Sequence, residues 1–284
     1  MNPILLSFAD GTTFFVGLIL VFIAEVLLLF IQQRFVRSAL TVCAFLGMML
    51  VVASATPLPL WMYVVWLVLA LIGVVLLNGF SEFRKVKHCM CFALLMVTVG
   101  LISMELPYRR APELVVSSGS TIYVLGDSIS VGMRVEDRAW PEVLQEMSGC
   151  RVVNCARAGA TVEGAFKQAL EISEPSSPVI IEIGGNDLLG GTKAFSYYKS
   201  LNRLVGSLVE EHQVLLVELP LFPFQNAYGR AQRRIVAEHG IALLPKKYFT
   251  RVLALPGSTS DGLHLTQQGH DAMAAMMNAL LFEN

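Results

Sequence analysis

The sequence lacks any strong excess of charge. Its 284 residues carry 21 Lys and Arg against 22 Asp and Glu, for a formal net charge of -1 at pH 7. Without a basic patch the chain has no electrostatic footprint for nucleic acid, and we expect no nucleic-acid partner. The chain also lacks a Cys/His cluster and a phosphate-cradling glycine loop. We therefore expect no metal and no nucleotide cofactor.

Cysteine is sparse as well, with five in the chain. Cys43, Cys89 and Cys91 fall in apolar segments, where a thiol behaves as a small hydrophobe. Cys150 and Cys155 flank R-V-V-N, and one extended strand would hold them roughly 16 Å apart, beyond disulfide reach. We expect free thiols, which neither confirm nor exclude an oxidising compartment.

Charged residues are scarce in the first part of the chain. Residues 1–107 hold nine of the 43 charged side chains, and residues 108–284 hold the other 34. The hydrophobic content of 55% and the mean hydropathy of +0.61 therefore come mainly from the first part. We predict a membrane domain over 1–107, a short linker over 108–120, and a globular domain over 121–284 that is long enough to bury a core.

Four apolar segments in the first part have the length of membrane-spanning helices. They cover residues 12–31, 39–55, 58–77 and 88–106. Each has about 17 to 20 residues, roughly what a helix needs to cross a bilayer core. The amino end has no basic region and its first apolar run is too long for a signal peptide, so we expect about four transmembrane helices and no cleaved leader.

The basic residues of the short loops predict the orientation. Five lie in the first and third loops and two follow the fourth segment: Arg34, Arg37, Arg84, Lys85 and Lys87 against Arg109 and Arg110. The positive-inside tendency places the loops with five inside, although the last pair favours the opposite. The globular domain would then face the periplasm or the cell exterior.

Glu25 lies in the middle of the first apolar segment. A carboxylate at membrane depth is costly and is a functional candidate by default. The alternative is that it faces the bundle interior and bonds a neighbouring helix. No second ionisable residue at that depth completes a relay, so a transport role lacks support.

The globular domain alternates strand and helix patterns. Apolar, β-rich runs predict strands near 121–125, 151–154, 178–183, 213–218 and 241–244. Helical patterns lie near 141–148, 162–173, 194–211, 226–239 and 266–281. This alternation predicts a parallel five-stranded sheet covered on both faces, an α/β domain with three α/β/α layers.

Four short blocks carry candidate chemistry. They read Y-V-L-G-D-S-I-S-V-G-M over 123–133, N-C-A-R-A-G-A-T over 154–161, G-G-N-D over 184–187, and D-G-L-H over 261–264. A lone G-D-S is weak, but the four blocks in this order resemble the SGNH (GDSL-type) serine hydrolase family, thioesterase and lysophospholipase members included. The resemblance covers residues 121 to about 281 and implies a flavodoxin-like fold.

The resemblance assigns roles that the chemistry of the residues supports. Ser128 would be the nucleophile, His264 its general base, and Asp261 the group that orients the imidazole. The backbone N–H groups of Ser128 and Gly159 and the side-chain amide of Asn186 would form the oxyanion hole.

Three neighbouring residues receive structural interpretations. We expect Trp140, which opens a helix before Pro141, to pack in the core. Glu182 is expected to be a hydrogen-bonded structural group. Leu265 stands where many family members have proline, which could alter the stiffness of the last loop.

These observations predict a membrane-anchored serine esterase without a cofactor. It would hydrolyse ester or thioester acyl groups of a small-molecule substrate through an acyl-serine intermediate, with lipid or lysophospholipid esters favoured by closeness to the bilayer. An O-acetylesterase acting on cell-envelope carbohydrate is the main alternative. A catalytically idle membrane-associated binding module is another, and acyl transfer to an alcohol uses the same intermediate.

Overall fold

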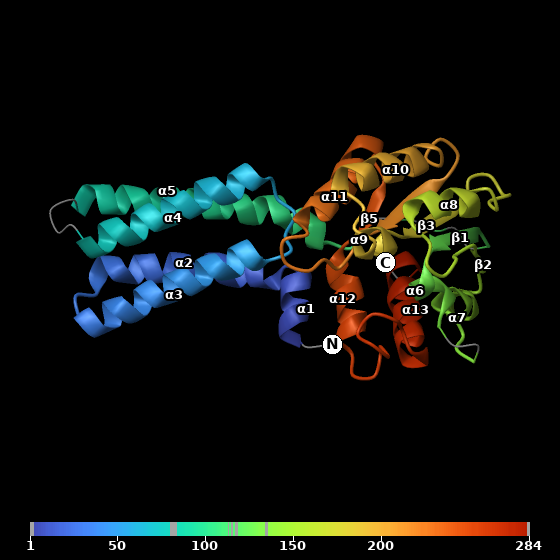
Figure 1. Cartoon of the computed structure of the whole chain (residues 1–284), viewed down its shortest axis with the longest axis horizontal. Helices are drawn as coiled ribbons and strands as arrows, with labels where there is room; N and C mark the ends of the chain where they lie inside the picture. Colours follow the sequence, from blue (N-terminus) through green and yellow to red (C-terminus); the bar gives the residue numbers. More distant parts are fainter. Residues whose placement is uncertain are drawn as a thin grey trace. The chain divides into compact units, whose positions relative to one another are not determined.

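The computed structural model describes residues 3–79, 84–112, 114, 116, 119–133 and 136–282 (Figure 1). Two compact units emerge from its contacts. One comprises Ser7–Arg109 with Phe222–Asn226, and the other comprises Met1–Leu6, Arg110–Leu221 and Ala227–Asn284. Positions 113, 115, 117 and 118 of the predicted linker lie outside the described residues.

The amino-terminal part is helical. It contains α1 (Pro3–Ala9), α2 (Thr12–Phe30), α3 (Arg34–Ala53), α4 (Leu60–Gly79), α5 (Arg84–Glu105) and the short 3-10 helix η1 (Leu106–Arg109). Four of these helices, α2 to α5, are long and apolar enough to cross a membrane, as the sequence predicted. The segment between α3 and α4 is not helical, because Pro57 and Pro59 each remove a backbone donor there.

Two helix starts differ from the prediction. The structure begins α3 at Arg34 and α5 at Arg84, several residues before the predicted starts at 39 and 88. Hydropathy marks only the apolar part of a helix, and both first turns carry basic side chains. The charged residues that were assigned to loops therefore belong to helix ends.

Small residues bring the helices of this unit together. A Cβ added to Gly17 of α2 would lie 2.5 Å from the Gly47 carbonyl oxygen of α3, so these two backbones touch in a way that only glycine permits. Around them, Phe14, Leu18 and Trp66 are fully buried. The unit is therefore packed by apolar contact and close backbone approach.

Glu25 faces the interior of the helical unit, in line with the alternative interpretation, but the described residues include no hydrogen-bond partner for it on a neighbouring helix. Its side chain is fully buried, and neither carboxylate oxygen has a hydrogen-bond partner among the described residues. Gly73 of α4 lies opposite, where an added Cβ would overlap the carboxylate. The missing side chain at Gly73 provides room for Glu25 but no polar partner.

The second unit contains a five-stranded parallel sheet, which confirms the predicted α/β fold. Its strands are β1 (Thr121–Gly126), β2 (Arg151–Asn154), β3 (Pro178–Glu182), β4 (Gln213–Val217) and β5 (Ala242–Leu244). They lie in the order β2-β1-β3-β4-β5, the flavodoxin-like order, and all pairs are parallel. Every residue of β1 and β3 is buried because helices cover both faces.

Helices cover the two faces of this sheet (Figure 1). On one side lie α7 (Trp140–Ser148), α12 (Lys246–Ala254) and α13 (Gln267–Phe282), whose apolar residues share one core with β1, β3 and β4. On the other lie α8 (Val162–Ala169), α10 (Ala194–Gly206) and α11 (Asn226–His239). Trp140 is fully buried in the first layer, so the expectation that it packs in the core is confirmed.

Candidate active site

The carboxyl end of β1 positions the predicted nucleophile. The strand ends at Gly126, Asp127 caps the following turn by accepting a hydrogen bond from Ile129 N at 3.0 Å, and Ser128 begins the one-turn helix α6 (Ser128–Val131). A Cβ at Gly126 would lie 2.6 Å from Ser130 Oγ, so the tight turn requires glycine. No described residue bonds the Ser128 backbone N–H, which leaves this donor available at the start of a helix.

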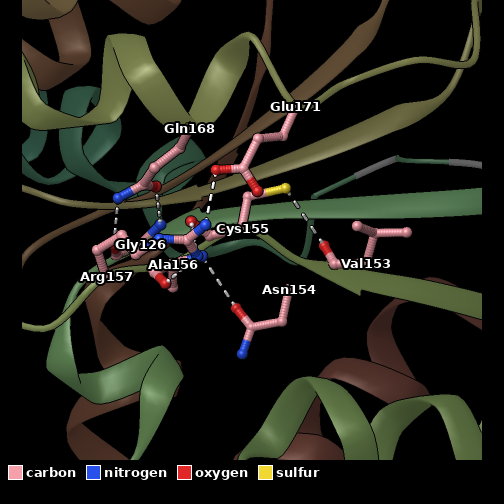
Figure 2. A network of polar contacts seen from close by, with 8 residues as sticks. All are labelled: Gly126, Val153, Asn154, Cys155, Ala156, Arg157, Gln168 and Glu171. Atoms are coloured by element: carbon pink, nitrogen blue, oxygen red, sulfur yellow. Dashed lines mark hydrogen bonds and ion pairs between the residues drawn. The ribbon is translucent and has the colours of Figure 1, made fainter.

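Gln168 of α8 holds the end of β1 from the side (Figure 2). Its amide donates to Gly126 O at 2.9 Å and accepts from Gly126 N at 2.9 Å, although the two residues lie 42 apart in sequence. The Arg157 backbone N–H also donates to Gly126 O. Gln168 is almost fully buried, and its side chain bonds both backbone groups of Gly126, as a neighbouring strand would. No sequence pattern indicates this role, because Gln168 lies within an ordinary amphipathic helix pattern.

The loop after β2 carries Gly159, with a positive φ of 73° that favours glycine. The Arg157 side chain supports this loop by donating to the carbonyls of Cys155 and Ala156 and pairing with Glu171 at 2.7 Å (Figure 2). Among the described residues, none accepts a bond from the Gly159 N–H. This backbone donor is therefore available to a ligand.

Asn186, in the short helix α9 (Gly185–Leu189), links the first three blocks. Its Nδ2 donates to Ala160 O at 2.9 Å and to Asp127 Oδ2 at 3.2 Å. The next residue, Asp187, accepts from Val162 N at 2.9 Å. The structure thus brings Asn186 next to the residue before Ser128 and the residue after Gly159.

Asp261 and His264 lie in the loop between α12 and α13. His264 Nδ1 is 2.7 Å from Asp261 Oδ2, and Asp261 Oδ1 accepts from the backbone N–H groups of Leu263 and His264. The bond from the His264 ring, followed by these two backbone bonds, holds the pKa of Asp261 below its usual range. Asp261 is thus an ionised group that fixes the ring with Nδ1 toward it and leaves Nε2 free to act.

Leu265 anchors this loop. It is 3% exposed within the core beneath the loop, and it pairs with Thr259 in an isolated antiparallel bridge. The Thr266 N–H donates to Ser258 O at 2.9 Å, which closes the same turn. The leucine that replaces the expected proline therefore holds the loop by apolar burial.

The charge of His264 influences the pKa of Asp127, the residue before Ser128. Burial raises the pKa of Asp127, while the Ile129 N–H bond and the charge of His264 lower it. No hydrogen bond of the described residues joins His264 to Ser128. Such catalytic hydrogen bonds commonly form only when substrate is bound. The arrangement can support serine-based acyl chemistry once the hydroxyl and the imidazole meet.

A buried hydrogen-bond network lies next to Ser128 in sequence and comprises Ser130, Glu182, Trp140 and His270. Ser130 Oγ donates to Glu182 Oε2 at 2.9 Å and accepts from Trp140 Nε1 at 3.2 Å. Burial, followed by the charge of Asp127, raises the pKa of Glu182 well above its usual range. The hydrogen bond confirms Glu182 as a bonded structural group. His270 also belongs to this network, because its ring accepts a hydrogen bond from the Trp140 backbone N–H at 3.2 Å. Burial lowers the pKa of His270.

Neither a metal cluster nor a disulfide competes with this chemistry in the part of the chain that the structure describes. No group of three or more His, Cys, Asp or Glu could hold a metal ion there. All five cysteines are free, which confirms the predicted thiols. Burial raises the pKa of the Cys155 thiol to about 11, so this cysteine is inert at neutral pH.

Known proteins resemble the second unit. Residues 124–272 match the GDSL-like Lipase/Acylhydrolase family. Esterase TesA of Pseudomonas aeruginosa is 30% identical over 163 residues, which are 52% of this chain and 81% of that protein. Thioesterase 1/protease 1/lysophospholipase L1 of Escherichia coli is 25% identical over 172 residues, 57% of this chain and 83% of that protein. The crystal structure of TesA has a TM-score of 0.48 and 28% identity, covering 57% of this chain and 99% of its own.

Proposed function

The chain belongs to the GDSL-like lipase/acylhydrolase family and is a serine ester hydrolase, and from this premise we propose that Ser128, His264 and Asp261 form its catalytic triad. The observation that carries the proposal is the Asp261–His264 pair, at 2.7 Å, on the loop that carries the fourth block of the family pattern. A serine hydroxyl needs such an oriented base because it is a weak nucleophile at neutral pH.

In the proposed mechanism, Ser128 Oγ attacks the acyl carbon while its proton passes to His264 Nε2. The carbon–oxygen or carbon–sulfur bond to the leaving group then breaks, and the alcohol or thiol leaves with the proton from His264. Water attacks the acyl-serine, gives its proton to the same nitrogen, and releases the carboxylic acid as Ser128 regains its hydrogen. Asp261 stays ionised and stabilises the imidazolium at each step.

The oxyanion of each tetrahedral intermediate would accept bonds from Ser128 N, Gly159 N and Asn186 Nδ2. The two backbone donors have no partner among the described residues. The Asn186 amide would exchange its 3.2 Å bond to Asp127, the longer of its two, for the oxyanion. Fixed donors of this kind stabilise developing charge more than mobile water does.

The four long apolar helices support membrane anchoring. In the proposed organisation, residues 1–107 form the multi-pass membrane domain, 108–120 the linker and 121–284 the hydrolase domain. The loops with five basic residues would lie inside and the hydrolase domain outside, in the periplasm or at the cell exterior. Retention in membranes after alkaline extraction tests the anchoring, and protease accessibility in intact cells tests the orientation.

Lipid or lysophospholipid acyl esters are the proposed substrates. A hydrolase tethered to a bilayer meets lipid at high local concentration, and one relative is a thioesterase and lysophospholipase by name. Turnover of long-chain esters should exceed turnover of acetyl esters. The reverse preference would favour O-acetyl groups of envelope carbohydrate.

The test of the reaction uses the full-length protein and short p-nitrophenyl esters. Wild-type protein should release p-nitrophenol and react with a fluorophosphonate probe, and Ser128→Ala should do neither. Ser130→Ala is the matched control, because this nearby serine bonds Glu182 and is expected to keep the probe reaction. Equal hydrolysis by wild type and Ser128→Ala would refute the assignment, and no reaction by either would indicate an idle binding domain.

A further inference from the structure

A polar cavity of about 720 Å³ lies in the helical unit, and none of the residues that line it belongs to the proposed triad. Its walls are the last turns of α2 and α4 and the first turns of α3 and α5. Residues 80–83, between α4 and α5, lie outside the described residues. The cavity therefore occupies the end of the unit where the basic first turns of α3 and α5 occur.

The lining of this cavity is basic. Arg34, Arg37 and Lys87 line it together with the polar residues Gln32, Asn78 and His88, and no Asp or Glu is among the lining residues that the structure describes. Between positions 26 and 104 the sequence holds five Lys and Arg and one acid, Glu82. Two helix carboxyl ends and two helix amino ends meet here, so their partial charges largely cancel. The side chains thus set a positive potential that favours an anion.

Two of the cations are held in place by backbone carbonyls. Arg37 Nη1 donates to Leu28 O at 3.0 Å and to Ile31 O at 2.7 Å, and its Nη2 donates to Leu77 O. Lys87 Nζ reaches the same Leu77 oxygen at 3.4 Å. Capping of α2 and α4 explains Arg37. Among the described residues, no hydrogen bond or ion pair engages the Arg34 side chain, and Lys87 makes only the long bond to Leu77. A preorganised cation costs a ligand little side-chain entropy on binding.

Apolar side chains adjoin these cations. Phe30 lines the cavity and is 71% exposed, and Phe35, next to Arg34, is 86% exposed. Leu28 and Leu29 form the inner wall. A free phosphate would use only the polar part of such a site, whereas a lipid uses both parts.

We propose that this cavity binds the phosphate-bearing headgroup of an anionic phospholipid, with the acyl chains along the exposed apolar faces of α2 and α3. The proposal rests on the membrane anchoring proposed above, which places helix ends at the level of the lipid headgroups. Basic pockets between membrane helices at this level are suited to anionic headgroups. Arg34 and Lys87 would contact the phosphate, and Arg37 would hold the helix ends around it.

The experiment measures lipid binding to the full-length protein in a non-ionic detergent, where no charged surface attracts cationic side chains. Phosphatidylglycerol, phosphatidylcholine and inorganic phosphate are titrated separately and detected by native mass spectrometry. Lys87→Gln and Lys85→Gln are a matched pair, because both remove one charge from the first turns of α5 but Lys85 does not line the cavity. Arg34→Gln tests the second cation.

We expect wild-type protein to prefer phosphatidylglycerol over both other probes. Lys87→Gln and Arg34→Gln should each weaken this binding about fivefold, and their combination about 25-fold, as expected from roughly one cation's contribution each. Lys85→Gln should bind as wild type does. An unchanged helical circular-dichroism signal and an unchanged elution volume in size-exclusion chromatography would show that the helical unit of each variant is folded.

Three outcomes would overturn the proposal. Equal weakening by Lys85→Gln would show diffuse attraction in place of a site, and equal affinity for phosphatidylcholine would remove the role of headgroup charge. Equal affinity for inorganic phosphate would assign the cavity to a soluble anion. A failure of the proposed esterase function would instead appear as lost Ser128-dependent turnover, and a failure of anchoring as release by alkaline extraction.

Discussion

Replacing Asn186 with alanine separates catalysis from stability at the proposed oxyanion hole. The substitution removes the amide that donates to Ala160 O at 2.9 Å and to Asp127 Oδ2 at 3.2 Å. In the ground state these bonds join three blocks of the site. In the transition state, the proposed mechanism gives one N–H to the oxyanion.

The two roles predict different magnitudes. Two hydrogen bonds at about 1 kcal/mol each give a loss of about 2 kcal/mol in the free energy of unfolding, or about 4 to 8 °C in Tm for a domain of this size. Loss of one oxyanion donor lowers kcat about 100- to 1000-fold, which corresponds to about 2.7 to 4 kcal/mol of transition-state stabilisation. Below its Tm the Asn186→Ala protein is folded, so the whole decrease in kcat can be measured there.

Asn154→Ala supplies the matched control. Asn154 also makes two hydrogen bonds near the site, but it is not one of the proposed oxyanion donors. It donates to Ser130 O at 2.8 Å and accepts from Ala156 N at 3.2 Å, the second of which Figure 2 shows. The assay compares kcat for a short p-nitrophenyl ester with Tm for both variants. We expect similar losses of Tm, with a decrease in kcat of less than about tenfold for Asn154→Ala.

Two results would refute this reasoning. One is an Asn186→Ala protein whose kcat stays within about threefold of wild type, since loss of a donor to the oxyanion lowers kcat far more than this. The other is an equal loss of kcat in Asn154→Ala, which would attribute the effect to general disturbance of the turn.

Three further substitutions test other parts of the account. Asp261→Asn should lower kcat about 100- to 10,000-fold with little change in KM in steady-state assays, because the imidazole loses its orienting charge; an unchanged kcat would remove Asp261 from the triad. Buried Glu182 keeps its proton in the folded state at pH values where the unfolded chain, with a carboxyl pKa of 4.5, has released it. Stability therefore falls as pH rises above 4.5, so Glu182→Gln should raise Tm at pH 8 but not at pH 4; equal effects at both would contradict the raised pKa. Gln168→Leu leaves the Gly126 N–H without its partner and should lower the free energy of unfolding by about 1 to 3 kcal/mol in thermal or chemical denaturation, whereas an unchanged value would show that this contact adds no stability.

The regular elements could be predicted because their patterns are local. All five strands lie within one or two residues of their predicted ranges, since apolar β-rich runs between turn residues mark buried parallel strands. The helix α12 was missed, although Phe249, Val252 and Leu253 form its buried face. The helices α6 and α9 were also missed, because a single turn has no period that a sequence pattern can show.

The residues of the candidate site could be predicted only where they belong to a known sequence motif. Ser128, Asn186, Asp261 and His264 lie in recognisable blocks, but the supporting contacts depend on the fold. Gln168 bonds a residue 42 positions away, and no local pattern encodes that pairing. Glu25 shows the same limit, because the space that its side chain occupies depends on Gly73 of another helix.

The central claim is that Ser128 is activated by His264, and the most direct measurement is the site and rate of phosphonylation. The full-length protein is treated with a fluorophosphonate, digested, and analysed by mass spectrometry, with His264→Ala treated in parallel. The account predicts a single adduct on Ser128, formed at least about 100-fold more slowly in His264→Ala, because the hydroxyl then lacks its base. An adduct on another residue, or an unchanged rate without the imidazole, would contradict it.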